Sequence, residues 1–244
     1  MTSVGFRRVK TPRAFEEIAK QIRSELSSRR LRVGDRLPAE RNLAEQFGVS
    51  RNTLREALRS LEHAGLLRLK KGVTGGSYIQ ESTGEAVISG LNDMYALGAI
   101  QPKHLTEARV IISTEVARLA CARRTKEDLA KLEENITAAE EATASGDMER
   151  RAEVNYEFHR LLARATGNPV LIIITDALMA ATRSFIEAIG YQLNTYVLPS
   201  RRRLLAALQA RDAEAAANEM KGMLVRLQRS HLARFKENAG KRTP

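Results

Sequence analysis

The sequence predicts a mainly α protein with two parts. These are an N-terminal winged helix-turn-helix with a small β-hairpin, and an all-α bundle of six or seven helices. A tight Gly48-Val49 turn separates two short amphipathic helical patterns, and two short apolar runs around a glycine-rich loop follow them. From residue 85 onward the chain repeats helical spacing with little Gly or Pro inside the segments. A chain of 244 residues is long enough for two such domains.

The first ten residues, MTSVGFRRVK, lack periodicity and predict a mobile basic arm. They contain no long apolar run, so a signal peptide is not expected. Thr11-Pro12 is typical of a helix start, because proline suits the first helical position. Helical spacing then continues through Phe15, Ile18, Ala19, Ile22 and Leu26. We expect the winged helix-turn-helix domain to span residues 11–80.

The two helices of the motif have clear apolar faces. The first face comprises Leu43, Ala44 and Phe47, and the second comprises Leu54, Ala57, Leu58 and Leu61. Gly48 suits the left-handed conformation that ends a helix, and Ser50 is a good N-cap for the next one. A short turn containing glycine between two helices is the helix-turn-helix pattern.

Polar residues at the start of the second helix predict contact with DNA bases. Arg51, Asn52, Thr53 and Arg55 occupy its first turn and a half, which faces base edges in this motif. Arginine can bind guanine with two hydrogen bonds, and asparagine can read adenine. Arg59, one turn further on, is expected at phosphate or in solvent. The alternative is an ordinary basic amphipathic helix, but the coinciding turn, cap and arginines favour the DNA-reading interpretation.

The segment after the motif predicts a cationic wing. Leu66–Leu69 and Ser77–Ile79 are the two apolar runs, and Lys70, Lys71 and Gly72 begin the loop between them. Such a tip can contact phosphates or enter a minor groove. A solvated hairpin tip is the alternative, above all for Lys70 taken alone.

Charge and composition agree with this division. Residues 1–80 contain 17 Lys and Arg against 8 Asp and Glu, whereas the remainder contains 23 against 21. A basic head on a nearly neutral body is typical of a nucleic-acid-binding module attached to another domain. The single cysteine, Cys121, excludes an intramolecular disulfide and fits a reducing cytoplasm. No apolar segment is expected to cross a membrane, and residues 171–174 are expected in the core.

Residues 81–84 are the expected linker, and residues 237–244 the expected tail. Between them breaks at glycine, proline and aspartate predict seven helices. These helices are expected near 85–98, 102–123, 126–145, 147–166, 169–189, 191–210 and 212–236. Together they form a helical bundle spanning 85–236 with a sizeable core.

The segment LPAERNLAEQFGVSRNTLREALRSLEHAGLL resembles the winged-helix domain of GntR-family bacterial transcription regulators. The resemblance runs from about residue 11 to residue 79. It implies that Arg41, at the start of the first motif helix, contacts operator DNA. It implies the same for Arg51, Thr53 and Arg55 of the recognition helix, and it places Gly72 where the wing approaches DNA.

The region 85–235 resembles the FCD ligand-binding domain of the FadR-like branch of that family. The matching segments are 107–109, 117–120, 155–162 and 210–216. The resemblance implies an antiparallel bundle around a polar cavity, where a bound small molecule alters operator affinity. Many members hold a divalent metal there through one Asp and three His.

At those four positions this sequence has Asn155, His159, Arg201 and Met223, so only one ligand is kept. Zinc and transition metals prefer anionic or imidazole ligands, and we therefore expect no bound metal. Arg109 matches a position that commonly lines the family's pocket. We hypothesise that Arg109 and Arg201 clamp a small organic acid or an acyl thioester, which Asn155 and His159 orient. Alternatively, Arg201 belongs to a solvated run with Arg202 and Arg203, and His159 is a core histidine.

These features predict a cytoplasmic transcription regulator, expected to be a repressor, that binds double-stranded DNA and responds to a small anionic effector. One winged helix contacts few bases, so a homodimer on an inverted-repeat operator is expected. The alternatives are a constitutive DNA-binding protein whose bundle only dimerises and a metal-dependent sensor of the same family. An enzyme is not expected, because no acid, nucleophile or phosphate loop accompanies His159.

Overall fold

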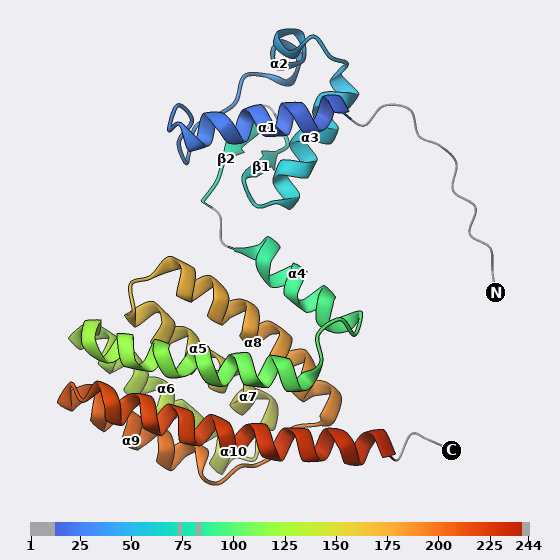
Figure 1. Ribbon diagram of the computed structural model, residues 1–244. Coiled ribbons are helices and arrows are strands. Elements are labelled where there is room, and N and C mark those ends of the chain that lie inside the picture. Colours follow the sequence, from blue (N-terminus) through green and yellow to red (C-terminus); the bar gives the residue numbers. More distant parts are fainter. Residues whose placement is uncertain (1–12, 73–74, 82–83, 241–244) are drawn as a thin grey trace. The chain divides into compact units, whose positions relative to one another are not determined.

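The computed structural model describes residues 13–72, 75–81 and 84–240, and it divides into two compact units, Met1–Ala86 and Val87–Pro244. The expected basic arm and the Thr11-Pro12 helix start lie outside the described residues. Figure 1 labels the ten helices and two strands of the described chain. The predicted fold class, a winged helix-turn-helix followed by an all-α bundle, is confirmed.

Three helices and a hairpin build the first unit. They are α1 (Arg13–Ser27), α2 (Glu40–Phe47), α3 (Arg51–His63), β1 (Leu67–Lys70) and β2 (Gly76–Ile79). The strands are antiparallel, with Leu67 opposite Ile79 and Lys70 opposite Gly76. One core unites all five elements, because buried side chains of α1, α2 and α3 pack against Leu67 and Ile79. The leucines predicted for the inner face of α3 are all buried.

Gly48 and Ser50 determine the turn between α2 and α3. Gly48 has φ 64°, and its N–H donates to the carbonyl of Glu45. This left-handed residue ends α2 at no steric cost, because glycine has no Cβ. The Ser50 hydroxyl accepts a hydrogen bond from the backbone N–H of Thr53 at 3.1 Å, so Ser50 is the N-cap of α3.

Seven helices of the described chain form the second unit. They are α4 (Glu85–Ala96), α5 (Pro102–Arg123), α6 (Lys126–Ala144), α7 (Met148–Ala165), α8 (Pro169–Ile189), α9 (Val197–Ala210) and α10 (Ala213–Gly240). Helices α5 and α10 run side by side, and α6 packs on α7 and on α9 (Figure 1). The main core lies among α5, α6, α7, α9 and α10. A smaller apolar cluster joins α5 and α8 with partly buried residues of α4.

The ninth helix differs from the sequence prediction. Helix α9 begins at Val197 instead of residue 191, and residues 190–196 form an irregular segment between α8 and α9. Pro199 explains the difference, because proline is tolerated in the first turn of a helix but breaks its interior. A helix beginning at 191 would have placed Pro199 in its third turn. The last helix also runs four residues beyond its predicted end, to Gly240, so residues 237–240 of the expected tail are helical.

Helix α8 corrects the expectation that no apolar segment could cross a membrane. By length and composition its 21 residues pass that test. Its inner face is nevertheless buried in the bundle at Thr175, Ala177, Leu178, Met179, Ala181 and Phe185. Asp176 accepts a hydrogen bond from Arg160 of α7 at 2.8 Å. These contacts are those of a core helix, since a charged pair inside lipid is costly.

Candidate functional site

The first candidate site is the exposed face of α3 in the N-terminal unit. Arg51, Asn52 and Arg55 are all exposed there, on the side of the helix that its buried leucines do not use. Thr53 is half-buried, and its hydroxyl lies 2.9 Å from that of Ser50. Arg41 is also exposed, at the start of α2. The structure thus presents the predicted base-reading residues to solvent, with Thr53 hydrogen-bonded to the helix cap.

Sequence reasoning missed Glu40, which lies between the two recognition arginines. Its carboxylate accepts a hydrogen bond from Arg55 Nε at 2.7 Å and lies 4.0 Å from Arg51 Nη2. Glu40 at the start of α2 therefore holds the Arg55 side chain of α3 through a hydrogen bond and lies at ion-pair distance from Arg51. A held arginine loses less side-chain entropy when it binds a ligand.

The hairpin gives the wing a defined shape. Lys71 and Gly72 are exposed at its tip, and Gly72 has φ 99°, which favours glycine. A Cβ at Gly75 would lie 2.6 Å from the carbonyl oxygens of Gly72 and Lys70, so the tip requires glycine there too. Arg36, which the sequence did not single out, donates to the carbonyl of Gly75 and lies over the Tyr78 ring. The wing is therefore held by a hydrogen bond from Arg36 and exposes the cation Lys71, which suits contact with DNA phosphates.

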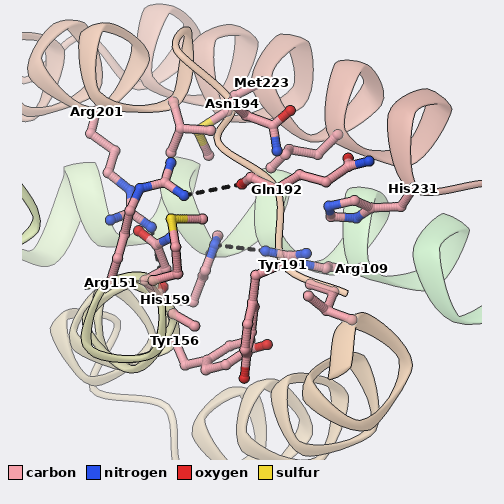
Figure 2. A pocket seen from close by; sticks show the side chains of 16 residues that line it. Arg109, Arg151, Tyr156, His159, Tyr191, Gln192, Asn194, Arg201, Met223 and His231 are labelled. Atoms are coloured by element: carbon pink, nitrogen blue, oxygen red, sulfur yellow. Dashed lines mark hydrogen bonds between the residues drawn. The ribbon is translucent and has the colours of Figure 1, made fainter. Parts of the chain in front are cut away.

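The second candidate site is a cavity inside the helical unit (Figure 2). Residues from α5, α7, α8, α9, α10 and the 190–196 segment line it. Its polar lining comprises Arg109, Arg151, Asn155, Tyr156, His159, Tyr191, Gln192, Asn194, Arg201 and His231. Its apolar lining comprises Met148, Ala152, Ile186, Val197, Met223 and Leu227. No carboxylate lines the cavity among the described residues, so its charged groups are all basic.

Arg109 and His159 form a buried pair at the cavity wall. Arg109 Nη2 lies 3.0 Å from His159 Nε2. A guanidinium can only donate, so Nε2 accepts and the proton of the neutral imidazole resides on Nδ1. Burial and the nearby Arg109 and Arg201 hold the pKa of His159 well below its usual value of 6.5. His159 is therefore neutral at physiological pH and adds no charge to the cavity.

Arg201 is buried, with 1% of its surface exposed, and lines the cavity. Its Nη2 donates to the backbone carbonyl of Asn155 at 3.1 Å, and its Cζ lies 4.2 Å from the Phe158 ring centre. Its Nε and Nη1 have no hydrogen-bond partner. Burial, with repulsion from Arg109 and Arg151, lowers the pKa of Arg201 to about 9. The solvated-run alternative therefore fails for Arg201, whereas Arg202 and Arg203 form surface ion pairs with glutamates.

Several other polar groups in the cavity also lack partners. These atoms are Arg109 Nε, Asn155 Oδ1 and the Tyr156 hydroxyl. Buried polar atoms are normally hydrogen-bonded, and unsatisfied ones call for an explanation. Here they gather around one cavity with the free nitrogens of Arg201. A ligand that brings both acceptors and a donor would satisfy them.

The sequence analysis missed Arg151, His231 and the 190–196 segment as parts of this site. Arg151 donates to Thr143 Oγ1 at 3.1 Å and to the carbonyl of Gln192 at 3.2 Å, which ties α7 to that segment. Helical period could have found two of the residues. Arg151 precedes Asn155 by one turn of α7, and His231 follows Met223 by two turns of α10. The 190–196 segment was not identified, because a helix was predicted from residue 191 to residue 210 although Pro199 argues against that start.

Asn155, His159, Arg201 and Met223 all line the cavity, as the family resemblance implied for the four ligand positions. These side chains do not suit a divalent metal, because one is a guanidinium and none is a carboxylate. His159 Nε2 already accepts from Arg109. In the described chain no group of three or more His, Cys, Asp or Glu could hold a metal ion.

Comparison with known proteins identifies both units. A family profile described as bacterial regulatory proteins of the gntR family matches residues 14–76, and the FCD domain profile matches residues 104–226. The chain belongs to the GntR family, in its FCD-containing group. The putative L-lactate dehydrogenase operon regulatory protein of Escherichia coli K12 is 30% identical over 220 residues, which cover 85% of this chain and 82% of that protein.

Further relatives extend over the same range. The Uxu operon regulator of Haemophilus influenzae is 29% identical over 217 residues, covering 85% of this chain and 78% of that protein. The solved structure of a Streptococcus agalactiae GntR protein matches with a TM-score of 0.63 and 26% identity. That match covers 88% of this chain and 99% of the other. This GntR-family chain is accordingly a transcription regulator and not an enzyme.

Proposed function

We propose that this regulator binds an inverted-repeat operator as a homodimer and represses transcription until a small anion enters the cavity of its helical unit. The observation that carries the proposal is the pair of buried arginines, Arg109 and Arg201, with unpartnered nitrogens and no acid in the cavity lining. An uncompensated buried charge is strongly unfavourable, so a site of this kind favours a ligand of opposite charge.

Carboxylates and phosphates fit these donors. A guanidinium offers paired N–H groups that match two oxygens of either anion. Asn155 and Tyr156 can then orient the rest of the ligand through their unpartnered oxygens, while His159 holds Arg109 in place.

The size of the cavity favours a small organic acid over an acyl thioester. The volume of the cavity is about 60 Å³, which is the liquid volume of about two water molecules. A compact acid therefore requires much less movement of the surrounding side chains than a long acyl chain would.

No divalent metal is part of this proposal. The family's metal position carries Arg201 here, and its guanidinium would repel a cation. The anion then meets arginine directly instead of a metal. Calorimetric titration of chelator-treated protein with zinc and nickel tests this point, and sub-micromolar binding that His159→Ala abolishes would contradict it.

Dimerisation is proposed on grounds of DNA recognition and surface character. A single winged helix contacts too few bases for selective binding, and two related by a two-fold axis read an inverted repeat. The helical unit also exposes the large apolar side chains of Leu97, Ile111, Val170 and Leu193, each of which is available for burial in a dimer. Sedimentation equilibrium of the full chain measures its oligomeric state.

The decisive experiment is operator release. An operator is first selected from random duplexes with the full-length protein, and gel shifts are then run across a panel of small organic acids. We expect at least one acid to release the operator from wild-type protein but not from Arg201→Met. Binding that no anion alters would favour the constitutive alternative, in which the helical unit only dimerises.

A further inference from the structure

The buried arginines of the cavity indicate how many negative charges its ligand has, and not only that the ligand is an anion. Arg109 and Arg201 are 7% and 1% exposed, and both have nitrogens without partners. Arg151 is a third buried guanidinium of the lining, but it has no buried nitrogen without a partner, because it is hydrogen-bonded to Thr143 and to the Gln192 carbonyl. Arg109 and Arg201 therefore keep N–H groups that a ligand can meet, and no carboxylate of the described lining pairs with either of them.

Among the described residues, no acid lines the cavity that could neutralise either of these two guanidiniums. The other basic lining residues are His159 and His231, whose pKa values burial lowers, to about 4 for His231. Both imidazoles are thus neutral at physiological pH. The described lining contains no Asp or Glu, so the cavity holds at least two positive charges and no negative one.

We propose that the effector is a dianion, either a dicarboxylate or a phosphate monoester, whose two negative charges meet Arg109 and Arg201. A monoanion would leave one buried guanidinium uncompensated, and a buried unpaired charge is strongly unfavourable. Arg109 lies on α5 and Arg201 on α9, so the two charges are presented from different walls of the cavity (Figure 2). This inference rests on the proposed function of the cavity as an anion-effector site.

The remaining lining limits the body of such a ligand. Met148, Ile186, Val197 and Leu227 leave room for a short apolar segment between the charged ends. Asn155 Oδ1 and the Tyr156 hydroxyl are the only non-arginine atoms of the described lining that are fully buried without a hydrogen-bond partner, and they suit a hydroxyl on the ligand. A compact dianion with one hydroxyl group could therefore meet the buried unpartnered nitrogens of Arg109 and Arg201 and these two oxygens.

Two matched pairs of probes test the effect of the second negative charge, because each pair compares a dianion with a monoanion of similar shape. Succinate is compared with succinamate, in which an uncharged amide replaces one carboxylate, and methyl phosphate is compared with dimethyl phosphate. Calorimetric titrations at pH 8 use the full-length wild-type protein, Arg109→Gln, Arg201→Gln and the control Arg203→Gln. Arg203 lies two residues from Arg201 but forms an exposed ion pair with Glu219.

We expect at least one dianion to bind wild-type protein about tenfold or more tightly than its monoanionic partner, a difference of about 1.4 kcal/mol. The pair that binds best distinguishes a dicarboxylate from a phosphate. In Arg109→Gln and in Arg201→Gln that preference should fall to about threefold or less, while Arg203→Gln retains it. Circular dichroism confirms that each variant is folded.

The possible outcomes distinguish failure of the dianion inference from failure of the proposed anion site. Equal binding of dianion and monoanion, with affinity lost in Arg201→Gln, would overturn the dianion inference and leave the anion site standing. A preference for dianions that survives both buried substitutions would place their binding elsewhere and also overturn the inference. If none of the four probes bound, both the inference and the proposed anion site would fail.

Discussion

Replacing Arg201 by methionine should stabilise the ligand-free protein. Burial lowers the pKa of Arg201 from 12.5 to about 9, so holding its charge in the folded state costs about 5 kcal/mol. Two contacts offset part of this cost. The hydrogen bond to the Asn155 carbonyl contributes about 1.5 kcal/mol, and stacking on Phe158 contributes about 2 kcal/mol.

The difference between the cost and these two contacts is an increase of about 1–2 kcal/mol in the free energy of unfolding of Arg201→Met. Methionine keeps an apolar side chain at this position and removes the charge. For a domain of this size the gain corresponds to a rise in Tm of about 2–8 °C. Urea unfolding, followed by circular dichroism in a buffer free of carboxylate and phosphate, measures it in the transition of the helical unit. The same variant should lose anion binding, because the destabilising charge is the one that binds.

Arg203→Met is the matched control, because Arg203 is exposed and paired with Glu219. An exposed ion pair contributes little, so this variant should lose between 0 and about 1 kcal/mol. A fall in stability for Arg201→Met larger than that of Arg203→Met would refute the reasoning. It would mean that Arg201 is a structural residue whose contacts outweigh the cost of its burial.

Three further predictions concern DNA binding and pH. Arg55→Ala should weaken operator binding about tenfold to a hundredfold in fluorescence anisotropy without changing Tm, because Arg55 is exposed and is proposed to read a base. Normal operator affinity in this variant would contradict the assignment of α3 as the reading helix. Lys71→Ala should weaken binding to all sequences alike and reduce the slope of log K against log salt by about one, and a changed sequence preference would argue against a phosphate contact. Stability should fall as pH drops below 6.5, because His231 titrates near 4 when folded and so takes up its proton mainly on unfolding. His231→Gln should reduce that fall, by up to about 1.4 kcal/mol per pH unit, in urea unfolding at pH 7.5, 6 and 5.

The DNA-binding unit was predictable from local signals. Gly48 and Ser50 mark a helix end and a helix start within three residues, and the leucines of α3 repeat at a period that no strand shares. Glu40 was not predictable, because its contact with Arg55 joins residues that are fifteen apart in the sequence. Such a pairing depends on the crossing of α2 and α3, which composition does not encode.

The effector cavity was predictable only in part. Arg109, Asn155, His159 and Arg201 were expected from the family resemblance, and the structure brings all four to one cavity. The period of α7 could have added Arg151. Tyr191 and Gln192 were not predicted to line the cavity, because a helix was expected from residue 191. Pro199 is the sequence signal against that helix, but it does not show which side chains of the irregular segment point into the cavity.

The central claim is that anion binding in the helical unit and operator binding by α3 are thermodynamically coupled. Operator affinity is measured with and without the saturating anion, and anion affinity is measured with and without saturating operator. Because coupling is reciprocal, the account predicts that both affinities fall by the same factor, at least about fivefold. It also predicts that Arg201→Met abolishes the effect on operator binding. An anion that binds in the cavity while leaving operator affinity unchanged would contradict the account.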